Sequence, residues 1–372
     1  MRVGVPKEIK NHEYRVGLTP SSVREVVAHG HEVLVERGAG AGISASDGDY
    51  ERVGAIIVDG ADAVFTRSEL IVKVKEPQPA ERARLRVDQV LFTYLHLAPD
   101  PAQTRDLLAS GVTAIAYETV TSAAGGLPLL APMSEVAGRM SVQAGAHSLE
   151  RANGGMGILL GGVPGVPPAR IAVLGAGVVG FNAAQLAIGT GAQVVVIDRD
   201  IEVLRRIDRL LGARVVTVYS NRDTIERQVL AADLVIGAVL IPGAAAPKLV
   251  SRDLIARMKP GAVVVDVSID QGGCFETSRP TTHADPTYVV DGVVHYCVAN
   301  MPGAVPRTST YALNNATLPH VLALADLGCR RALERDAHLR AGLNIHRGQV
   351  TCPEVAAALG YQAVDPLAAL RA

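Results

Sequence analysis

Short β-rich segments alternate with segments of helical periodicity along most of this chain, and that alternation restricts its fold more than any other feature. In the first 120 residues the strands are expected at 2–6, 31–36, 55–59, 70–74, 89–94 and 113–117. The helices expected between them lie at 20–29, 47–54 and 101–110. Strands separated by helices pair in parallel and are covered on both faces, so this stretch predicts one doubly wound α/β unit.

A second series of the same kind begins near Ile171. Its strands are expected at 171–174, 194–197, 215–218, 234–239 and 263–267. Residues 134–153 have a helical pattern that would suit a spine joining the two units, and after Asn300 the pattern is helical to the C-terminus. The prediction is an α/β fold of two doubly wound, parallel-sheet (Rossmann-like) domains with an active-site cleft between them. The first is discontinuous, over 1–130 plus 305–372, and the second spans 131–304.

Composition and charge limit the function. A chain of 372 residues is longer than one hydrophobic core usually supports, which agrees with two domains. A net charge of −1 gives no reason to expect nucleic acid or a membrane surface as a partner. The N-terminus lacks the pattern of a secretory signal, and the nearest candidate for a membrane span, 234–247, is broken by proline and glycine. We therefore expect a soluble, cytoplasmic protein.

The four cysteines are widely spread along the second half of the sequence. They are Cys274, Cys297, Cys329 and Cys352. Their spacing matches neither a zinc site nor a redox couple, so reduced thiols and no bound metal are expected.

A glycine-rich turn marks the start of the second unit. Gly175, Gly177 and Gly180 follow an apolar strand and open an alanine-rich helix. This context makes the spacing a dinucleotide fingerprint, because the glycines let the backbone approach a pyrophosphate at the helix N-terminus. The alternative is a strand, turn and helix with a structural role only.

Asp198 ends the next strand of the second unit, where the fingerprint requires an acidic residue. Its carboxylate would accept hydrogen bonds from the adenosine ribose and repel a 2′-phosphate, so NAD is preferred over NADP. Arg199 follows directly and would soften that discrimination.

Three side chains of the first unit follow strands, at the edge where open α/β sheets bind ligands. Arg15 precedes the helix announced by Thr19 and Pro20, and its guanidinium is well placed to hold a small carboxylate in a bidentate fork. Lys75 and His96 follow the strands at 70–74 and 89–94. The alternatives are a solvated lysine beside Glu76 and a histidine that only caps a strand.

Four further residues lie near the same kind of edge. Glu118 follows the strand at 113–117, and we interpret it as a surface carboxylate rather than a member of the site. Asp270 follows the last strong strand of the second unit, where it would face the nicotinamide; a turn-forming aspartate is the alternative. Asn300 and Met301 end a later strand, and would contact the ring and substrate or simply close a loop.

Several separated motifs together resemble the L-alanine dehydrogenase family over essentially the whole chain. They are Gly-Val-Pro-Lys-Glu followed by Glu-Tyr-Arg-Val, then Val-Lys-Glu-Pro, Tyr-Leu-His-Leu-Ala, Ala-Pro-Met-Ser-Glu-Val-Ala-Gly-Arg, Asp-Gln-Gly-Gly-Cys-Phe-Glu and Ala-Asn-Met-Pro. The resemblance implies NAD-dependent, reversible oxidative deamination of L-alanine to pyruvate and ammonium, by hydride transfer to nicotinamide through iminopyruvate. It also implies a homohexamer.

The resemblance also implies roles for individual residues. Arg15 and Lys75 would bind the substrate, and His96 and Asp270 would be catalytic. The cofactor contacts implied are Ser134, Gly177, Val178, Asp198, Ser220, Val239, Leu240, Arg279, Val298 and Met301. Some relatives carry a basic residue in the turn after the ribose-binding aspartate; Val203 stands near that place here, which puts a charged adenosine contact in question.

The chemistry of these residues suggests a mechanism as a hypothesis. Histidine side chains exchange protons readily near neutral pH, so His96 is suited to general acid/base catalysis. Asp270 would orient water or ammonia beside a cationic imine. Three rivals stay open: a dehydrogenase of glycine/glyoxylate or another small amino acid, the NAD-binding part of a transhydrogenase, and a catalytically silent NAD-sensing protein.

Overall fold

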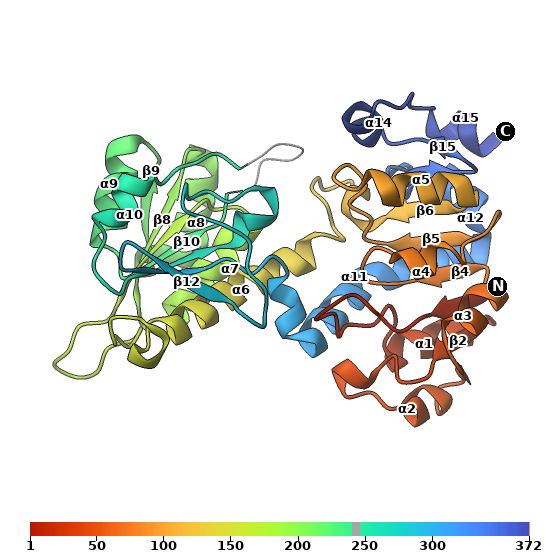
Figure 1. Cartoon of the computed structure of the whole chain (residues 1–372), viewed down its shortest axis with the longest axis horizontal. Coiled ribbons are helices and arrows are strands. Elements are labelled where there is room, and N and C mark those ends of the chain that lie inside the picture. Colours follow the sequence, from red (N-terminus) through yellow and green to blue (C-terminus); the bar gives the residue numbers. More distant parts are fainter. Residues whose placement is uncertain (240–245, 372) are drawn as a thin grey trace. The chain divides into compact units, whose positions relative to one another are not determined.

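The computed structural model describes residues 1–239 and 246–371, and it divides the chain into two compact units (Figure 1). The first comprises Met1–Met133 and Val305–Ala372, and the second comprises Ser134–Ala304. Each unit is built on one mostly parallel sheet, as the alternation of strands and helices predicts.

The first unit contains an eight-stranded sheet in the order β15-β14-β6-β5-β4-β1-β2-β3. Its strands are β1 Arg2–Val5, β2 Glu32–Glu36, β3 Ile56–Val58, β4 Leu70–Val72, β5 Val90–Thr93, β6 Thr113–Ala116, β14 Leu343–His346 and β15 Gln349–Val350. Strands β1 to β6 pair in parallel. β4, β5 and β6 are buried at every position, because helices cover both faces.

The helices of the first unit agree with most of the predicted ranges. They are α1 Pro20–Ala28, α2 Asp47–Glu51, α3 Ala61–Arg67, α4 Pro79–Arg82, α5 Pro101–Ser110, α11 Pro306–Leu327, α12 Cys329–Arg335, α13 Ala337–Arg340, α14 Pro353–Leu359 and α15 Pro366–Arg371. Capping residues explain the sharp starts: Thr19 accepts from Ser22 N, and Asp100 accepts from Gln103 N.

The C-terminal segment corrects one expectation. It is not helical throughout, because β14 joins β6 antiparallel and β15 pairs with β14 (Figure 1). The turn between them places Arg347 and Gly348 at φ +44° and +81°, the two positive values that a tight hairpin turn requires. The arginine-glycine pair between short apolar runs was the available signal.

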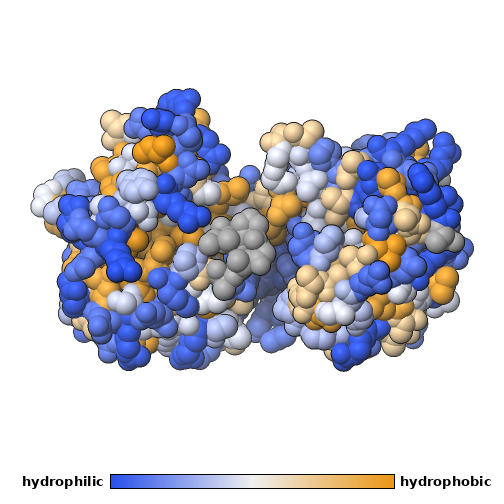
Figure 2. Space-filling view, turned by 90° about the horizontal axis from the view of Figure 1, so that it is seen from above, coloured by the Kyte–Doolittle hydropathy of each residue, from blue (hydrophilic) through white to orange (hydrophobic). Residues whose placement is uncertain are grey.

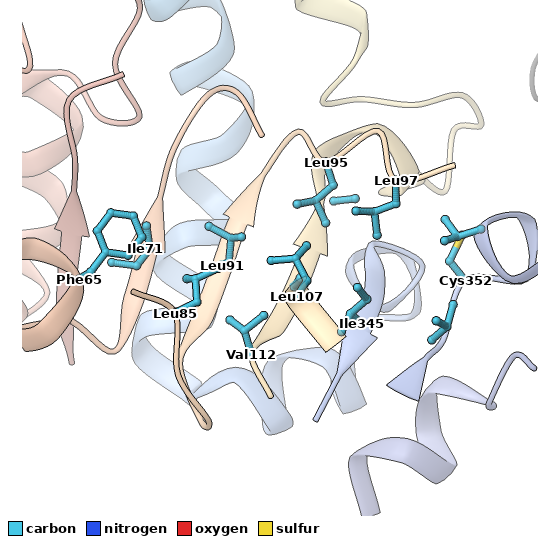
Figure 3. Packing of buried hydrophobic residues seen from close by; sticks show 14 of the residues in the cluster. Phe65, Ile71, Leu85, Leu91, Leu95, Leu97, Leu107, Val112, Ile345 and Cys352 are labelled. Carbon is cyan, nitrogen blue, oxygen red and sulfur yellow. The ribbon is translucent and has the colours of Figure 1, made fainter. Parts of the chain in front are cut away.

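Side chains from strands and helices across the first unit form its hydrophobic core (Figure 3). They include Ile71 of β4, Leu91 of β5, Ile345 of β14 and Leu107 of α5. All four are fully buried, so each removes an aliphatic side chain from water, worth about 1.5–3 kcal/mol. This packing holds the strand ends that carry the candidate residues.

The second unit contains a seven-stranded sheet in the order β12-β13-β11-β10-β7-β8-β9. Its strands are β7 Arg170–Leu174, β8 Gln193–Asp198, β9 Val216–Tyr219, β10 Leu234–Gly237, β11 Val263–Asp266, β12 Thr287–Val290 and β13 Val293–Tyr296. All pairs are parallel except β12 with β13. Its helices are α6 Ala131–Ser148, α7 Val178–Gly189, α8 Ile201–Leu211, α9 Arg222–Ala231 and α10 Arg252–Ala256. The helix expected at 134–153 is thus shorter, ending at Ser148.

Charged and polar side chains are interspersed with hydrophobic ones over the face shown in Figure 2, as the near-zero net charge leads one to expect. Among the described residues, no helix is both long enough and apolar enough to cross a bilayer.

The four cysteines are free thiols, of which Cys329 is half-buried and the others are buried.

Candidate active site

The loop after β1 places Arg15 beside Glu13, and both side chains are buried. Arg15 Nε donates to Glu13 Oε1 at 2.7 Å and Nη2 donates to Oε2 at 2.6 Å. Nη1 donates to the Sδ of Met133 at 2.9 Å. Burial opposes ionisation of Glu13, but the hydrogen bonds and charge of Arg15 hold the pKa of Glu13 below its usual value.

This pairing differs from the open guanidinium fork that the sequence suggested. A buried guanidinium requires a counter-charge, and Glu13 supplies it two residues away. Nη1 contacts the Met133 thioether, a weak acceptor that a carboxylate would readily replace.

The segment after β4 carries two lysines with different environments. Lys73 is fully buried, and its Nζ lies 2.7 Å from Glu81 Oε1 and 3.1 Å from Glu8 Oε2. Burial lowers the pKa of Lys73, but the two carboxylates outweigh burial and raise it, so the lysine is charged. Lys73 is therefore a structural cation.

Lys75 is half-buried rather than fully solvated. Its backbone N–H and that of Val74 both donate to Glu8 Oε1, at 3.4 and 2.8 Å, so the buried cluster fixes the chain that carries it. Its positive charge helps to lower the pKa of Glu76 and of Glu13, although burial opposes this at both carboxyls. The structure thus brings Lys75 and Arg15 to the same carboxylate, Glu13.

His96 follows β5 and is the exposed member of this group, with 45% of its side chain accessible. Its ring is parallel to that of Tyr94, with an interplanar angle of 7° and centroids 5.8 Å apart. Burial raises the pKa of Tyr94, while the charge of Arg15 opposes the rise, which places the phenol near that guanidinium. Tyr94 therefore lies near the Arg15 guanidinium and also stacks on the His96 ring.

Glu118 is not the surface carboxylate that the sequence suggested. Only 15% of its side chain is exposed, and it accepts hydrogen bonds from the backbone N–H groups of Leu95 and His96. Its Oε1 also lies 3.9 Å from His96 Nδ1. Tertiary contact between the ends of β5 and β6 creates this arrangement, which spacing along the chain does not reveal.

The glycine-rich turn of the second unit has the geometry that the fingerprint requires. Gly175 has φ +94°, and a Cβ on Gly180 would lie 1.9 Å from the carbonyl oxygen of Gly175. A Cβ on Gly177 would meet no protein atom within 4 Å, and α7 begins there without a side-chain cap. The open approach and the uncapped amides fit a pyrophosphate.

Replacing Gly177 by alanine should therefore weaken NADH binding without destabilising the chain. The new methyl group occupies the space that the pyrophosphate needs, so we expect the Kd for NADH to rise roughly 10-fold or more, about 1.4 kcal/mol. Fluorescence titration measures this, and Gly189→Ala is the matched control because its Cβ also meets open space. A Kd that is unchanged in Gly177→Ala would contradict the assignment.

Asp198 ends β8 with both carboxylate oxygens held by backbone amides. Oδ2 accepts from Ala176 N at 2.7 Å and Oδ1 accepts from Asp200 N at 2.9 Å. Each oxygen keeps a second lone pair for a ribose hydroxyl. Ser220 lies beside the same strand end, where its N–H donates to the carbonyl oxygen of Asp198 at 2.9 Å.

A charged side chain does approach this end of the second unit, although Val203 does not supply it. Val203 donates its N–H to Asp200 Oδ1 within the first turn of α8. Arg206, one turn further along, reaches the carbonyl oxygen of Ala176 with Nη2 at 3.5 Å. Helical spacing from Val203 was the signal that could have found it.

The segment that carries Asp270 is shaped by a different aspartate. Asp266 is fully buried at the end of β11, and its carboxylate accepts from Ser268 N, Cys274 N and Ser278 Oγ at 3.1, 2.9 and 2.5 Å. Asp270 lies in the 3₁₀ turn Val267–Gln271 and is exposed. Asp266 therefore stabilises the loop that carries Asp270.

The other residues implied as cofactor contacts lie on loops and termini of the second unit. The guanidinium of Arg279 lies 4.0 Å from the ring centroid of Tyr288. Val239 accepts from Ser268 Oγ at 2.7 Å, and Val178 is exposed at the start of α7. Ser134 is half-buried in α6, Val298 and Met301 are buried, and Leu240 lies outside the described residues.

Several residues of the site were not singled out in the sequence. Glu13, Tyr94 and Met133 surround Arg15, and Asp266 organises the second unit's loop. Among the described residues, no group of three or more histidine, cysteine, aspartate and glutamate side chains is arranged to hold a metal ion.

The fold and these residues define a two-unit α/β protein, with a glycine-rich turn of dinucleotide-fingerprint geometry in one unit and the candidate residues Arg15, Lys75 and His96 in the other. Models of the alanine dehydrogenase/PNT N-terminal and C-terminal domains match residues 4–137 and 141–353. The chain therefore belongs to the alanine dehydrogenase/PNT family.

Individual relatives agree with this membership. An alanine dehydrogenase from Halomonas elongata is 62% identical over 365 residues, which is 98% of each chain. A solved L-alanine dehydrogenase structure is 54% identical, with a TM-score of 0.94 over 97% of this chain and 99% of the other. A transhydrogenase from Sinorhizobium meliloti is 25% identical, with a TM-score of 0.81 over 95% and 99%.

Proposed function

We propose that this chain catalyses the NAD-dependent, reversible oxidative deamination of L-alanine to pyruvate and ammonium through iminopyruvate. The observation that carries the proposal is that Arg15 and Lys75 act on Glu13 while His96 stacks on Tyr94, in a chain with a complete dinucleotide fingerprint. Full-length similarity to proteins named alanine dehydrogenase supports it.

The cofactor is NAD, which accepts or donates the hydride. In this proposal Gly175, Gly177 and Gly180 accommodate the pyrophosphate, and Asp198 holds the adenosine ribose. The remaining contacts are the other positions implied by the resemblance: Ser134, Val178, Ser220, Val239, Leu240, Arg279, Val298 and Met301. The unit Ser134–Ala304 is thus the NAD-binding domain, and the discontinuous unit is the substrate domain.

Arg15 and Lys75 bind the substrate in this proposal. The carboxylate replaces the Met133 thioether at Arg15 Nη1, because it is a stronger acceptor and carries the opposite charge. Glu13 keeps the other two guanidinium nitrogens in place, so the approach direction is fixed before substrate arrives. The ammonium of Lys75 stabilises the developing charge on the carbonyl oxygen of pyruvate.

His96 and Asp270 complete the chemistry. Amination and hydrolysis of the imine require protons to move between water, the carbonyl oxygen and the amine, and His96 carries them. Asp270 orients water or ammonia and stabilises the cationic imine.

The discriminating experiment is an initial-rate assay of NADH oxidation. The proposal predicts turnover that requires both pyruvate and ammonium, with slower turnover for glyoxylate plus ammonium. One methyl group supports about 1–3 kcal/mol of discrimination, so faster turnover of glyoxylate would favour the small amino acid alternative. NADH binding without any turnover would favour a transhydrogenase-like or NAD-sensing protein.

Replacing Asp198 by asparagine should relax the preference for NADH. The substitution removes the charge that repels a 2′-phosphate but keeps one acceptor oxygen, and Arg199 and Arg206 are nearby cations. We expect the ratio of kcat/KM for NADPH over NADH to rise roughly 10-fold or more, since a charge contact near a surface is worth a few kcal/mol. Asp208→Asn, on exposed α8, is the control; equal ratios in both variants would contradict the role of Asp198.

We also propose a cytoplasmic homohexamer, following the family resemblance. Leu159, Val163 and Val166 are 65%, 54% and 57% exposed in one hairpin segment, and a subunit interface would cover such residues. Light scattering of the purified protein tests the assembly, and a monomeric mass would overturn it.

A further inference from the structure

His96 has a backbone conformation that a histidine adopts only at a cost. Its φ is +49°, in the left-handed region that favours glycine, and this costs about 1–2 kcal/mol for other residues. Such a conformation persists only where the surroundings hold it. The question is which contact compensates at this position.

Glu118 supplies that contact. Its Oε1 accepts from His96 N at 2.6 Å, and Leu95 N lies 3.2 Å from both carboxylate oxygens. Two successive backbone N–H groups that converge on one anion form a nest, which a left-handed residue makes possible. Hydrogen bonds to a charged group contribute about 1.5–3 kcal/mol each, enough to offset the backbone strain.

Other contacts fix the residues next to His96. Gln103 Nε2 donates to the carbonyl oxygen of Leu95, and Tyr94 Oη donates to that of Leu129, both at 2.6 Å. Tyr94 is further held edge-on against Tyr117. The polypeptide before His96 is therefore held by several contacts, and Glu118 binds the backbone N–H of His96 itself.

The same carboxylate also faces the imidazole. Nδ1 lies 3.9 Å from Glu118 Oε1, while stacking on Tyr94 fixes the plane of the ring. With Nδ1 directed toward Glu118, Nε2 lies on the other side of the ring. The side chain as a whole is 45% exposed. Nε2 is then the nitrogen that can meet a substrate.

We propose that Glu118 is a positioning residue that holds His96 in its left-handed conformation and directs Nε2 to the substrate. This inference rests on the proposed function, in which His96 moves protons during amination and imine hydrolysis. Glu118 acts through His96 and touches neither substrate nor cofactor.

The test is a double-substitution cycle with Glu118→Ala and Glu118→Gln, each in the wild-type and His96→Ala backgrounds. In the wild-type background we expect Glu118→Ala to lower kcat about 10- to 100-fold, because a displacement near 1 Å can cost about 100-fold. The KM for pyruvate and the Kd for NADH should change less than about threefold. Glu118→Gln should lose less, because its amide oxygen still accepts in the nest.

The His96→Ala background separates positioning from general destabilisation. Once the imidazole is gone, removal of Glu118 should change kcat less than about twofold, because nothing remains to be oriented. Glu69→Gln is the matched control. Glu69 accepts from Arg2 N at 2.7 Å at the amino ends of β1 and β4, whereas His96 follows the carboxyl end of β5, so kcat should be unchanged. Thermal unfolding of each variant verifies the fold, and Glu118→Gln serves if Glu118→Ala does not fold.

Two outcomes would overturn the role of Glu118. One is a normal kcat in both Glu118 variants, and the other is an equal loss of kcat in the two backgrounds. A wild-type chain that does not turn over pyruvate plus ammonium would contradict the proposed function instead, so the two failures are distinguishable.

Discussion

Replacing His96 by alanine is expected to lower kcat for NADH oxidation with pyruvate and ammonium by about 10²- to 10⁴-fold, the usual contribution of a general acid/base. Without the imidazole, the protons that leave and reach the carbonyl oxygen and the amine must move through water. Steady-state kinetics at saturating substrate measure the loss. The Kd for NADH should stay within about twofold, because the dinucleotide-binding turn belongs to the other unit.

The control for this prediction is His147→Ala, which removes an exposed histidine near the end of α6 that contacts Glu150 and Asn153. Its kcat should equal that of the wild type. A His96→Ala variant that keeps more than about half of the wild-type kcat would contradict proton transfer by His96.

Replacing Lys73 by methionine should cause the largest loss of stability, about 3–5 kcal/mol of the free energy of unfolding of the first unit. Methionine fills a similar volume but leaves Glu8 and Glu81 buried without their cation. Urea denaturation followed by circular dichroism measures the loss. Lys10→Met is the control, because the Lys10–Glu76 pair is partly exposed and should contribute about 1 kcal/mol or less.

The loss in Lys73→Met should also depend on pH. Burial raises the pKa of Glu8 in the folded chain, and Lys73 opposes that rise, so the substitution raises it further. A carboxyl with a higher pKa in the folded state binds more protons there than when unfolded, so stability falls as pH increases. The deficit should therefore be smaller near pH 5 than near pH 8; a deficit that grows on acidification would contradict this account.

The sequence alone was sufficient to predict the positions of the strands that are buried on both faces. β4, β5 and β11 are short apolar runs, and their positions follow from composition alone. The β14–β15 hairpin was missed because its apolar residues are few, and only pairing with β6 makes Leu343–His346 a strand. The antiparallel β12 is likewise defined by its partner β13 rather than by its own pattern.

The residues of the candidate site also divide into those that the sequence pattern predicted and those that it did not. Lys75, His96, Asp198 and Asp270 were predicted because parallel strands present their carboxyl ends at one edge of a sheet. Glu13 and Asp266 were not singled out, and Glu118 was interpreted as a surface carboxylate, because their contacts depend on the groups that they meet in space. A carboxylate that binds a guanidinium or two backbone amides has no distinguishing pattern in the chain.

The most direct test of the central claim is a product analysis of L-alanine with NAD⁺. The account predicts that NADH, pyruvate and ammonium form in equal amounts from L-alanine, and that adding pyruvate and ammonium to NADH reverses the reaction. Formation of NADH without stoichiometric pyruvate and ammonium, or no NADH at all from L-alanine, would contradict oxidative deamination as the activity of this chain.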